Sequence, residues 1–122
     1  MIMSTELRNG SMSPAMKAVL LNAGVLAISD DALGRQATEC TAAGCKHGGV
    51  LYGGATSVWN KTLADGSVAV GLLNTGDFGN VGTAFGDFNV SFTAEAVGLP
   101  CTAFTATDVF KGKTLGTFTG GY

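Results

Sequence analysis

The strongest constraint on this chain is the spacing of its apolar residues, which changes from a helical period to strict alternation. In the second half, apolar and polar or small side chains alternate in the runs Val68–Leu73, Phe88–Thr93 and Phe104–Thr107. A period of two is typical of strands that bury one face. Glycine contributes 19 of the 122 residues, roughly twice its usual share of about 7%. Short strands joined by glycine turns predict a mainly β fold, an antiparallel β-sandwich.

Two turns mark the connections between the expected strands. Ala64-Asp65-Gly66 predicts a hairpin, because Asp-Gly tolerates the positive φ angles of a type I′ turn. A strand over Ser57–Trp59 would enter this hairpin. Lys111-Gly112-Lys113 predicts the second turn, and it leads into a last strand over Thr114–Thr119.

The first part of the chain has a helical pattern. Ser13 is suited to the N-cap and Pro14 to the first helical position. Apolar residues then recur at helical spacing, at Met16, Val19, Leu20 and Ala23. Gly24 fits the position that ends a helix. The sequence therefore predicts one helix over Pro14–Ala23, followed by a short apolar run and a turn over Asp30–Gly34.

Composition excludes several classes of function. Charged residues make up only 13% of the chain and the net charge is -2, so no basic patch for nucleic acid is expected. No apolar run approaches the length of about 18 residues that a membrane span requires. The glycine pairs near residue 50 lack the lysine and helix of a phosphate-binding loop. No cofactor and no metal is expected.

The cysteines allow two interpretations. Cys40 and Cys45 flank a short loop, which favours a local disulfide in an oxidising compartment. A zinc site that includes His47 is the alternative, but it needs a fourth ligand and the chain has a single histidine. Cys101 lies in a strand pattern and is expected to be a buried thiol.

Three sequons for N-glycosylation occur, at Asn9, Asn60 and Asn89. The alternating pattern places Asn89 on the solvent face of its strand. Together with the cysteines, the sequons favour a secreted or lysosomal/vacuolar protein. No signal peptide is visible after Met1, so an export signal is expected upstream.

Trp59 is the aromatic residue with a candidate binding role. Aromatic faces stack on sugar rings, so Trp59 could contact a carbohydrate. Its neighbours, Val58 and Asn60, are equally typical of a core strand or of a contact between domains, which is the alternative interpretation.

The amino-acid sequences of five segments resemble one known family. Leu63–Asp77 and Val97–Tyr122 resemble the C-terminal β-domain of the α-galactosidases (melibiases) of glycoside hydrolase family 27. Ile2–Asn9, Leu20–Asn22 and Val25–Gln36 resemble, in order and spacing, the end of the (β/α)8 barrel of the same enzymes. Glu6, Ser29-Asp30 and Ala32 depart from the family pattern.

The resemblance implies a division of the chain. Residues 1–36 would be the C-terminal remnant of the catalytic barrel, 37–54 a Gly/Cys loop or linker, and 55–122 the antiparallel β-domain. Family enzymes continue into a final strand, so the chain is expected to be a fragment. A homodimer of the parent enzyme is compatible with this resemblance.

The implied activity is retaining hydrolysis of terminal α-linked galactose, with an α-galactoside bound through the missing barrel. α-N-acetylgalactosaminidase activity on the same scaffold is an alternative, and so is a stand-alone carbohydrate-binding or structural sandwich. The family's two catalytic aspartates belong to earlier barrel strands, so no catalytic residue is expected in this chain and the isolated chain is expected to be inactive. Asp30-Asp31 could suggest a catalytic pair, but neighbouring residues of an extended segment point to opposite faces, and turn capping is the alternative.

Overall fold

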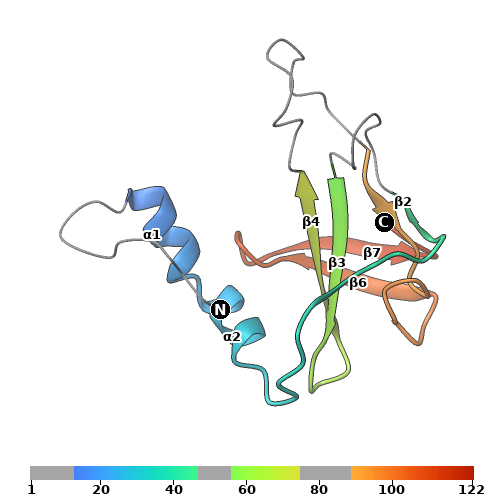
Figure 1. Ribbon diagram of the computed structural model, residues 1–122, viewed down its shortest axis with the longest axis horizontal. Helices are drawn as coiled ribbons and strands as arrows, with labels where there is room; N and C mark the ends of the chain where they lie inside the picture. Colours follow the sequence, from blue (N-terminus) through green and yellow to red (C-terminus); the bar gives the residue numbers. More distant parts are fainter. Residues whose placement is uncertain (1–12, 47–55, 75–88) are drawn as a thin grey trace, which may run out of the picture.

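The computed structural model describes residues 13–46, 56–74 and 89–122, and in this part of the chain two short helices lie to one side of a β-domain (Figure 1). The elements follow in the order α1 (Pro14–Leu20), α2 (Ala23–Ser29), β1 (Thr38–Glu39), β2 (Cys45–Lys46), β3 (Thr56–Thr62), β4 (Val68–Asn74), β5 (Ser91–Phe92), β6 (Ala103–Asp108) and β7 (Lys113–Thr119). The chain is mainly β, and the strand pairs that it forms are antiparallel. The predicted fold class is therefore confirmed.

The helical part differs from the prediction at its C-terminal end. Helix α1 begins as expected, with Pro14 in its first turn and the Ser13 hydroxyl accepting a hydrogen bond from the Met16 N–H at 3.2 Å. The helix ends at Leu20, however, and the Asn22 side chain caps α2 by accepting from the Val25 N–H at 3.1 Å. The prediction of one helix ending before Gly24 was wrong, because Asn22 starts a second helix.

The β-domain contains two groups of strands. In the first, β3 lies between β1 and β4, with Trp59 opposite Glu39 on one side and Gly71 on the other. In the second, β2 pairs with β5, and β6 pairs with β7. Residues 120–122, which follow β7, continue this second group: the N–H and carbonyl of Tyr122 bond the carbonyl and N–H of Phe92 at 2.9 and 3.0 Å.

The core lies between these groups of strands. Val58 of β3 and Val97 are fully buried and cluster with Cys40, Cys45 and Phe92. Half-buried side chains pack around this cluster, among them Val68, Val70, Val90, Leu99 and Phe104. The β6–β7 hairpin crosses the direction of β3 and β4 in Figure 1, and Phe104 contributes to the core from it.

Four aromatic rings extend the core toward the end of the chain. Phe92 stacks with Phe104 and Tyr122 at centroid distances of 6.2 and 5.9 Å. Phe118 contacts Phe104 at 6.0 Å and Tyr122 edge-on at 4.9 Å. Such pairs contribute about 0.5–1.5 kcal/mol each beyond simple burial. This cluster ties β5, the β6–β7 hairpin and the last residues together.

The connections correct three further expectations. The β3–β4 hairpin is present, but its connection runs from Leu63 to Ser67, with Gly66 at φ 83°, and is longer than a two-residue turn. The described part of the predicted linker, residues 37–46, supplies β1 and β2. Cys101 is exposed, because the chain bends there and β6 begins only at Ala103.

Several expectations fall outside the described residues: the first part of the proposed barrel remnant, before residue 13, the Asn9 sequon and His47. No helix in the described ranges is long and apolar enough to cross a membrane.

Candidate functional site

The outward face of β3 carries the residue with the clearest binding chemistry, Trp59. Alternation along the strand turns Val58 toward the core and Trp59 away from it, and Trp59 is 38% exposed. Ser57 and Lys61, two residues to either side, share this outward face. The structure therefore places Trp59 outside the core, and contact with a sugar or with another domain stays a prediction.

The ring of Trp59 is held in one orientation. Its indole Nε1–H donates to the Ser57 hydroxyl at 2.9 Å, so the ring lies along its own strand. Opposite it on β4, Gly71 has no side chain, and a Cβ there would lie 3.8 Å from the Trp59 Cβ. Glu39 is the register partner on β1. A fixed aromatic ring beside an open position and a carboxylate can stack on a flat apolar surface, such as one face of a pyranose ring.

The end of α2 covers the same face of the sheet beside Trp59. The Lys61 side chain is only 9% exposed, and its ammonium group donates to the carbonyl of Ile28 and, at 3.5 Å, to that of Ser29. A cation at the C-terminal end of a helix also interacts favourably with the helix dipole. Lys61 therefore fastens α2 to β3.

Asp31 makes the next tie between the helical part and the sandwich. Its two carboxylate oxygens accept from the Ala64 N–H at 3.0 and 3.1 Å, and one of them also accepts from the Leu33 N–H at 3.1 Å. The carboxylate thus joins the turn after α2 to the β3–β4 hairpin. This geometry is the turn-capping role that was the alternative to a catalytic Asp30-Asp31 pair.

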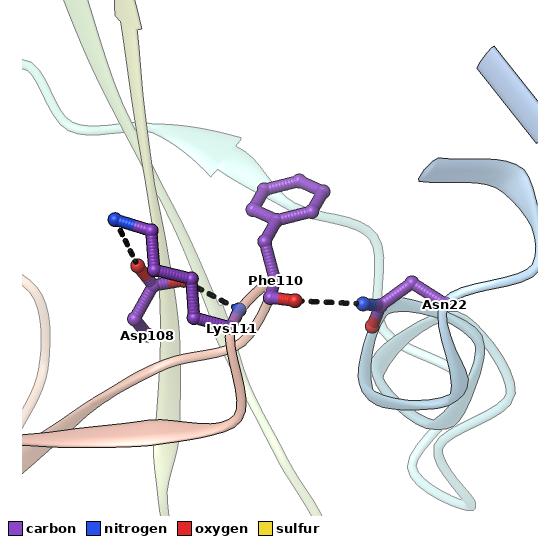
Figure 2. A network of polar contacts seen from close by, with 4 residues as sticks. All are labelled: Asn22, Asp108, Phe110 and Lys111. Carbon is purple, nitrogen blue, oxygen red and sulfur yellow. Dashed lines mark hydrogen bonds and ion pairs between the residues drawn. The ribbon is translucent and has the colours of Figure 1, made fainter. Parts of the chain in front are cut away.

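The start of α2 is tied to the opposite hairpin, as Figure 2 shows. The Asn22 side-chain amide donates to the Phe110 carbonyl at 3.2 Å, while Asp108 accepts from the Lys111 N–H at 3.1 Å and lies 3.7 Å from the Lys111 ammonium. Gly24 approaches the same turn so closely that a Cβ would lie 2.8 Å from the Val109 side chain. The glycine therefore serves close packing between α2 and β6–β7.

Asp65 has a structural role in its turn. The Ser67 hydroxyl and backbone N–H donate to its carboxylate at 2.6 and 2.9 Å. These hydrogen bonds hold the pKa of the exposed Asp65 carboxyl below its ordinary value of 3.8, the side-chain bond having the larger effect. Asp31, Asp65 and Asp108 thus all bond backbone groups of turns.

The cysteines form the local disulfide that was expected. Cys40 and Cys45 are bonded, with Cα atoms 6.1 Å apart, and both are buried. The zinc alternative is therefore disfavoured, since these two thiols are bonded to each other. Within residues 13–46, 56–74 and 89–122 no group of three or more His, Cys, Asp or Glu side chains could hold a metal ion.

The two described sequons have different environments. Asn60 points inward, and its side-chain nitrogen, the atom that would carry a glycan, donates to the carbonyl of the fully buried Val97 at 3.3 Å. Asn89 is exposed, and Val90 separates it from β5. The geometry is compatible with a glycan at Asn89 and unfavourable for one at Asn60.

Sequence reasoning did not find the ties made by Asn22, Asp31 and Lys61. Their partners lie 88, 33 and 33 residues away, so no local pattern could reveal them. The N-cap position of Asn22 was the one available signal, because Asn is a favoured N-cap residue.

No curated protein matches the chain, and neither does any solved structure. Comparison with known families matches residues 53–122, more than half of the chain, to the alpha galactosidase C-terminal beta sandwich domain. The match spans β3 to β7, and the antiparallel architecture agrees with it. The chain belongs to the alpha galactosidase C-terminal beta sandwich domain family.

Proposed function

We propose that this chain is the non-catalytic C-terminal part of a retaining α-galactosidase that releases terminal α-linked galactose from oligosaccharides or glycoconjugates. The family match over residues 53–122 is the observation that carries the proposal. Retaining glycosidases use two carboxyl groups about 5–5.5 Å apart. In this proposal both belong to a catalytic (β/α)8 barrel, of which residues 1–36 are the last portion.

The use of the acidic side chains supports this division of labour. Asp31, Asp65 and Asp108 each accept hydrogen bonds from backbone N–H groups of turns. A carboxylate engaged in this way has a structural task and is poorly placed to attack a substrate. The sandwich then contributes stability and position, and the chemistry takes place outside these 122 residues.

The experiment compares the purified 122-residue chain with a longer protein that also includes the residues encoded upstream of it. Both are assayed with aryl α-galactoside and with aryl α-N-acetylgalactosaminide. We expect no turnover by the chain alone and galactoside hydrolysis by the longer product. Preference of the longer product for the N-acetylated substrate would favour the α-N-acetylgalactosaminidase alternative. Turnover by the purified chain would contradict the non-catalytic role.

Trp59 supports a second candidate function, carbohydrate binding by the sandwich itself. The supporting observation is the exposed, outward indole whose N–H is fixed by Ser57. Affinity electrophoresis in a gel containing galactomannan tests this function directly. Retardation that is lost in Trp59→Ala and kept in Phe110→Ala would support it, since Phe110 is an exposed aromatic residue elsewhere, in the β6–β7 turn. Equal mobility of all three proteins with and without polysaccharide would contradict carbohydrate binding through Trp59.

A further inference from the structure

The two sequons of the described β-domain differ in what surrounds their acceptor atoms. N-glycosylation replaces one hydrogen of the asparagine side-chain nitrogen with a sugar, so this nitrogen must face open solvent in the folded protein. The environment of each acceptor nitrogen therefore decides which sequon the fold tolerates in modified form.

Asn60 is half-buried, and its acceptor nitrogen faces the segment that contains Val97. It lies on the central strand β3, opposite Thr38 of β1 and Val70 of β4, and shares the inward face with Val58. The nitrogen donates to Val97, whose side chain is fully buried. A sugar on this atom would crowd the segment that contains Val97, because the nitrogen already lies 3.3 Å from the Val97 carbonyl oxygen.

Asn89 has the opposite environment. Val90 packs against the core and Phe92 is buried, so the alternating pattern turns Asn89 to the other side, where it is exposed. A glycan on Asn89 extends into solvent and displaces none of the core contacts. The sequon hydroxyl belongs to Ser91, in the short strand β5.

The disulfide supplies an independent indication of the compartment. Cys40 and Cys45 are 4% and 6% exposed and contribute to the core, so the sandwich is built around a disulfide bond. Structural disulfides form in the oxidising secretory pathway, where N-glycans are also attached. The same folding environment thus accounts for both features.

We infer that this chain matures in the secretory pathway and carries an N-glycan at Asn89, while the sequon at Asn60 stays unmodified in the folded protein. The inference does not depend on the proposed glycosidase function, because it rests on the sequons, their burial and the disulfide alone.

The test is secretion of the complete 122-residue chain from yeast behind a secretion signal. The glycans are removed by an amidase in heavy-oxygen water, which marks each formerly glycosylated asparagine as labelled aspartate, and peptide masses then give the occupancy of each sequon. We expect label at Asn89 and none at Asn60. The secreted Asn89→Gln variant should be lighter than the wild type by the mass of one glycan, and the Asn60→Gln variant should show no such loss.

Leu115→Asn provides the positive control, because it creates the sequon Asn-Gly-Thr at an exposed position of β7. The chain retained inside the cells is analysed in the same way, so poor secretion still gives a result. An empty Asn89 in both fractions beside an occupied control sequon would overturn the inference. A glycan at Asn60 in the secreted, disulfide-bonded chain would overturn it equally.

Discussion

At the scale of single residues, Gly44 shows how tightly the disulfide loop packs against the segment after β5. A Cβ at this position would lie against the Thr93 hydroxyl and 2.8 Å from the Ala96 Cβ, and the Gly44 carbonyl accepts from the Thr93 N–H at 2.9 Å. This hydrogen bond prevents the loop from moving away. We expect Gly44→Ala to lower the free energy of unfolding by about 1–3 kcal/mol, the usual range for overpacking. Urea denaturation followed by the fluorescence of the single tryptophan measures it.

Gly71→Ala is the matched control at this scale. Its Cβ would lie 3.8 Å from the Trp59 Cβ, an ordinary van der Waals distance, on an exposed position of β4. We expect the free energy of unfolding to change by no more than about 0.5 kcal/mol. Equal losses in both variants would show that the steric argument at Gly44 is wrong.

At the scale of elements, the disulfide joins the two groups of strands. Cys40 directly follows β1, which pairs with β3, and Cys45 begins β2, which pairs with β5. For a loop as short as a sequence separation of 5, chain entropy gives a stabilisation of about 2 kcal/mol. The Cys40→Ala/Cys45→Ala variant should lose at least about this amount, because buried sulfur atoms are lost as well. Cys101→Ala, at an exposed position, should match the wild type within about 0.5 kcal/mol in the same denaturation experiment.

The β3–β4 hairpin should make a small, pH-dependent contribution to stability. The folded state lowers the pKa of Asp65 through hydrogen bonds from Ser67. The contribution is therefore fully present above the ordinary carboxyl pKa and is lost as the pH falls through the lower folded-state pKa. Between about pH 5 and about pH 3, the wild type should lose more free energy of unfolding than Asp65→Asn. Ser67→Ala should reduce this difference, and identical pH profiles for the wild type and Asp65→Asn would contradict the role of the carboxylate.

The elements also show which parts of the fold local patterns can predict. Alternation was sufficient for β4 and β6, because the period of a strand appears in consecutive residues. The Asp-Gly and Lys-Gly-Lys turns gave the places of the two hairpins and of β7, although the first connection is longer than the predicted turn. Strands β1 and β2 were missed, since each has two residues and exists only through its distant partner. The split between α1 and α2 was missed because the apolar spacing continues across Asn22. The role of Trp59 as a sugar or interface contact stays a prediction. Its outward direction follows from the burial of Val58 beside it, and that burial depends on contacts with residues distant in the sequence.

At the scale of the whole molecule, the two helices differ in how they belong to the β-domain. Helix α2 is tied at its start by Asn22 to the β6–β7 turn, and at its end by Lys61 to β3. Asp31 adds a tie to the β3–β4 hairpin. Neither helix has a buried residue, so these ties make the difference: none of them starts from α1, on which Met16 and Val19 are exposed. The cooperative unit should therefore include α2 and exclude α1, although the family match begins only at residue 53.

Two exposed alanines, Ala18 in α1 and Ala27 in α2, test this boundary. Replacing alanine with glycine inside a helix costs about 1 kcal/mol of helix stability, but the cost enters global unfolding only when the helix unfolds together with the domain. Ala27→Gly should therefore lower the free energy of unfolding by about 1 kcal/mol, and Ala18→Gly should leave it unchanged. Amide hydrogen exchange should agree, with α2 protected more strongly than α1. Equal effects of the two substitutions would mean that the helices belong to one unit, or that neither is coupled to the sandwich. If the helices belong to one unit with the sandwich, both substitutions should lower the free energy of unfolding. If neither helix is coupled to it, neither substitution should change the free energy of unfolding, and the ties made by Asn22, Asp31 and Lys61 would contribute little.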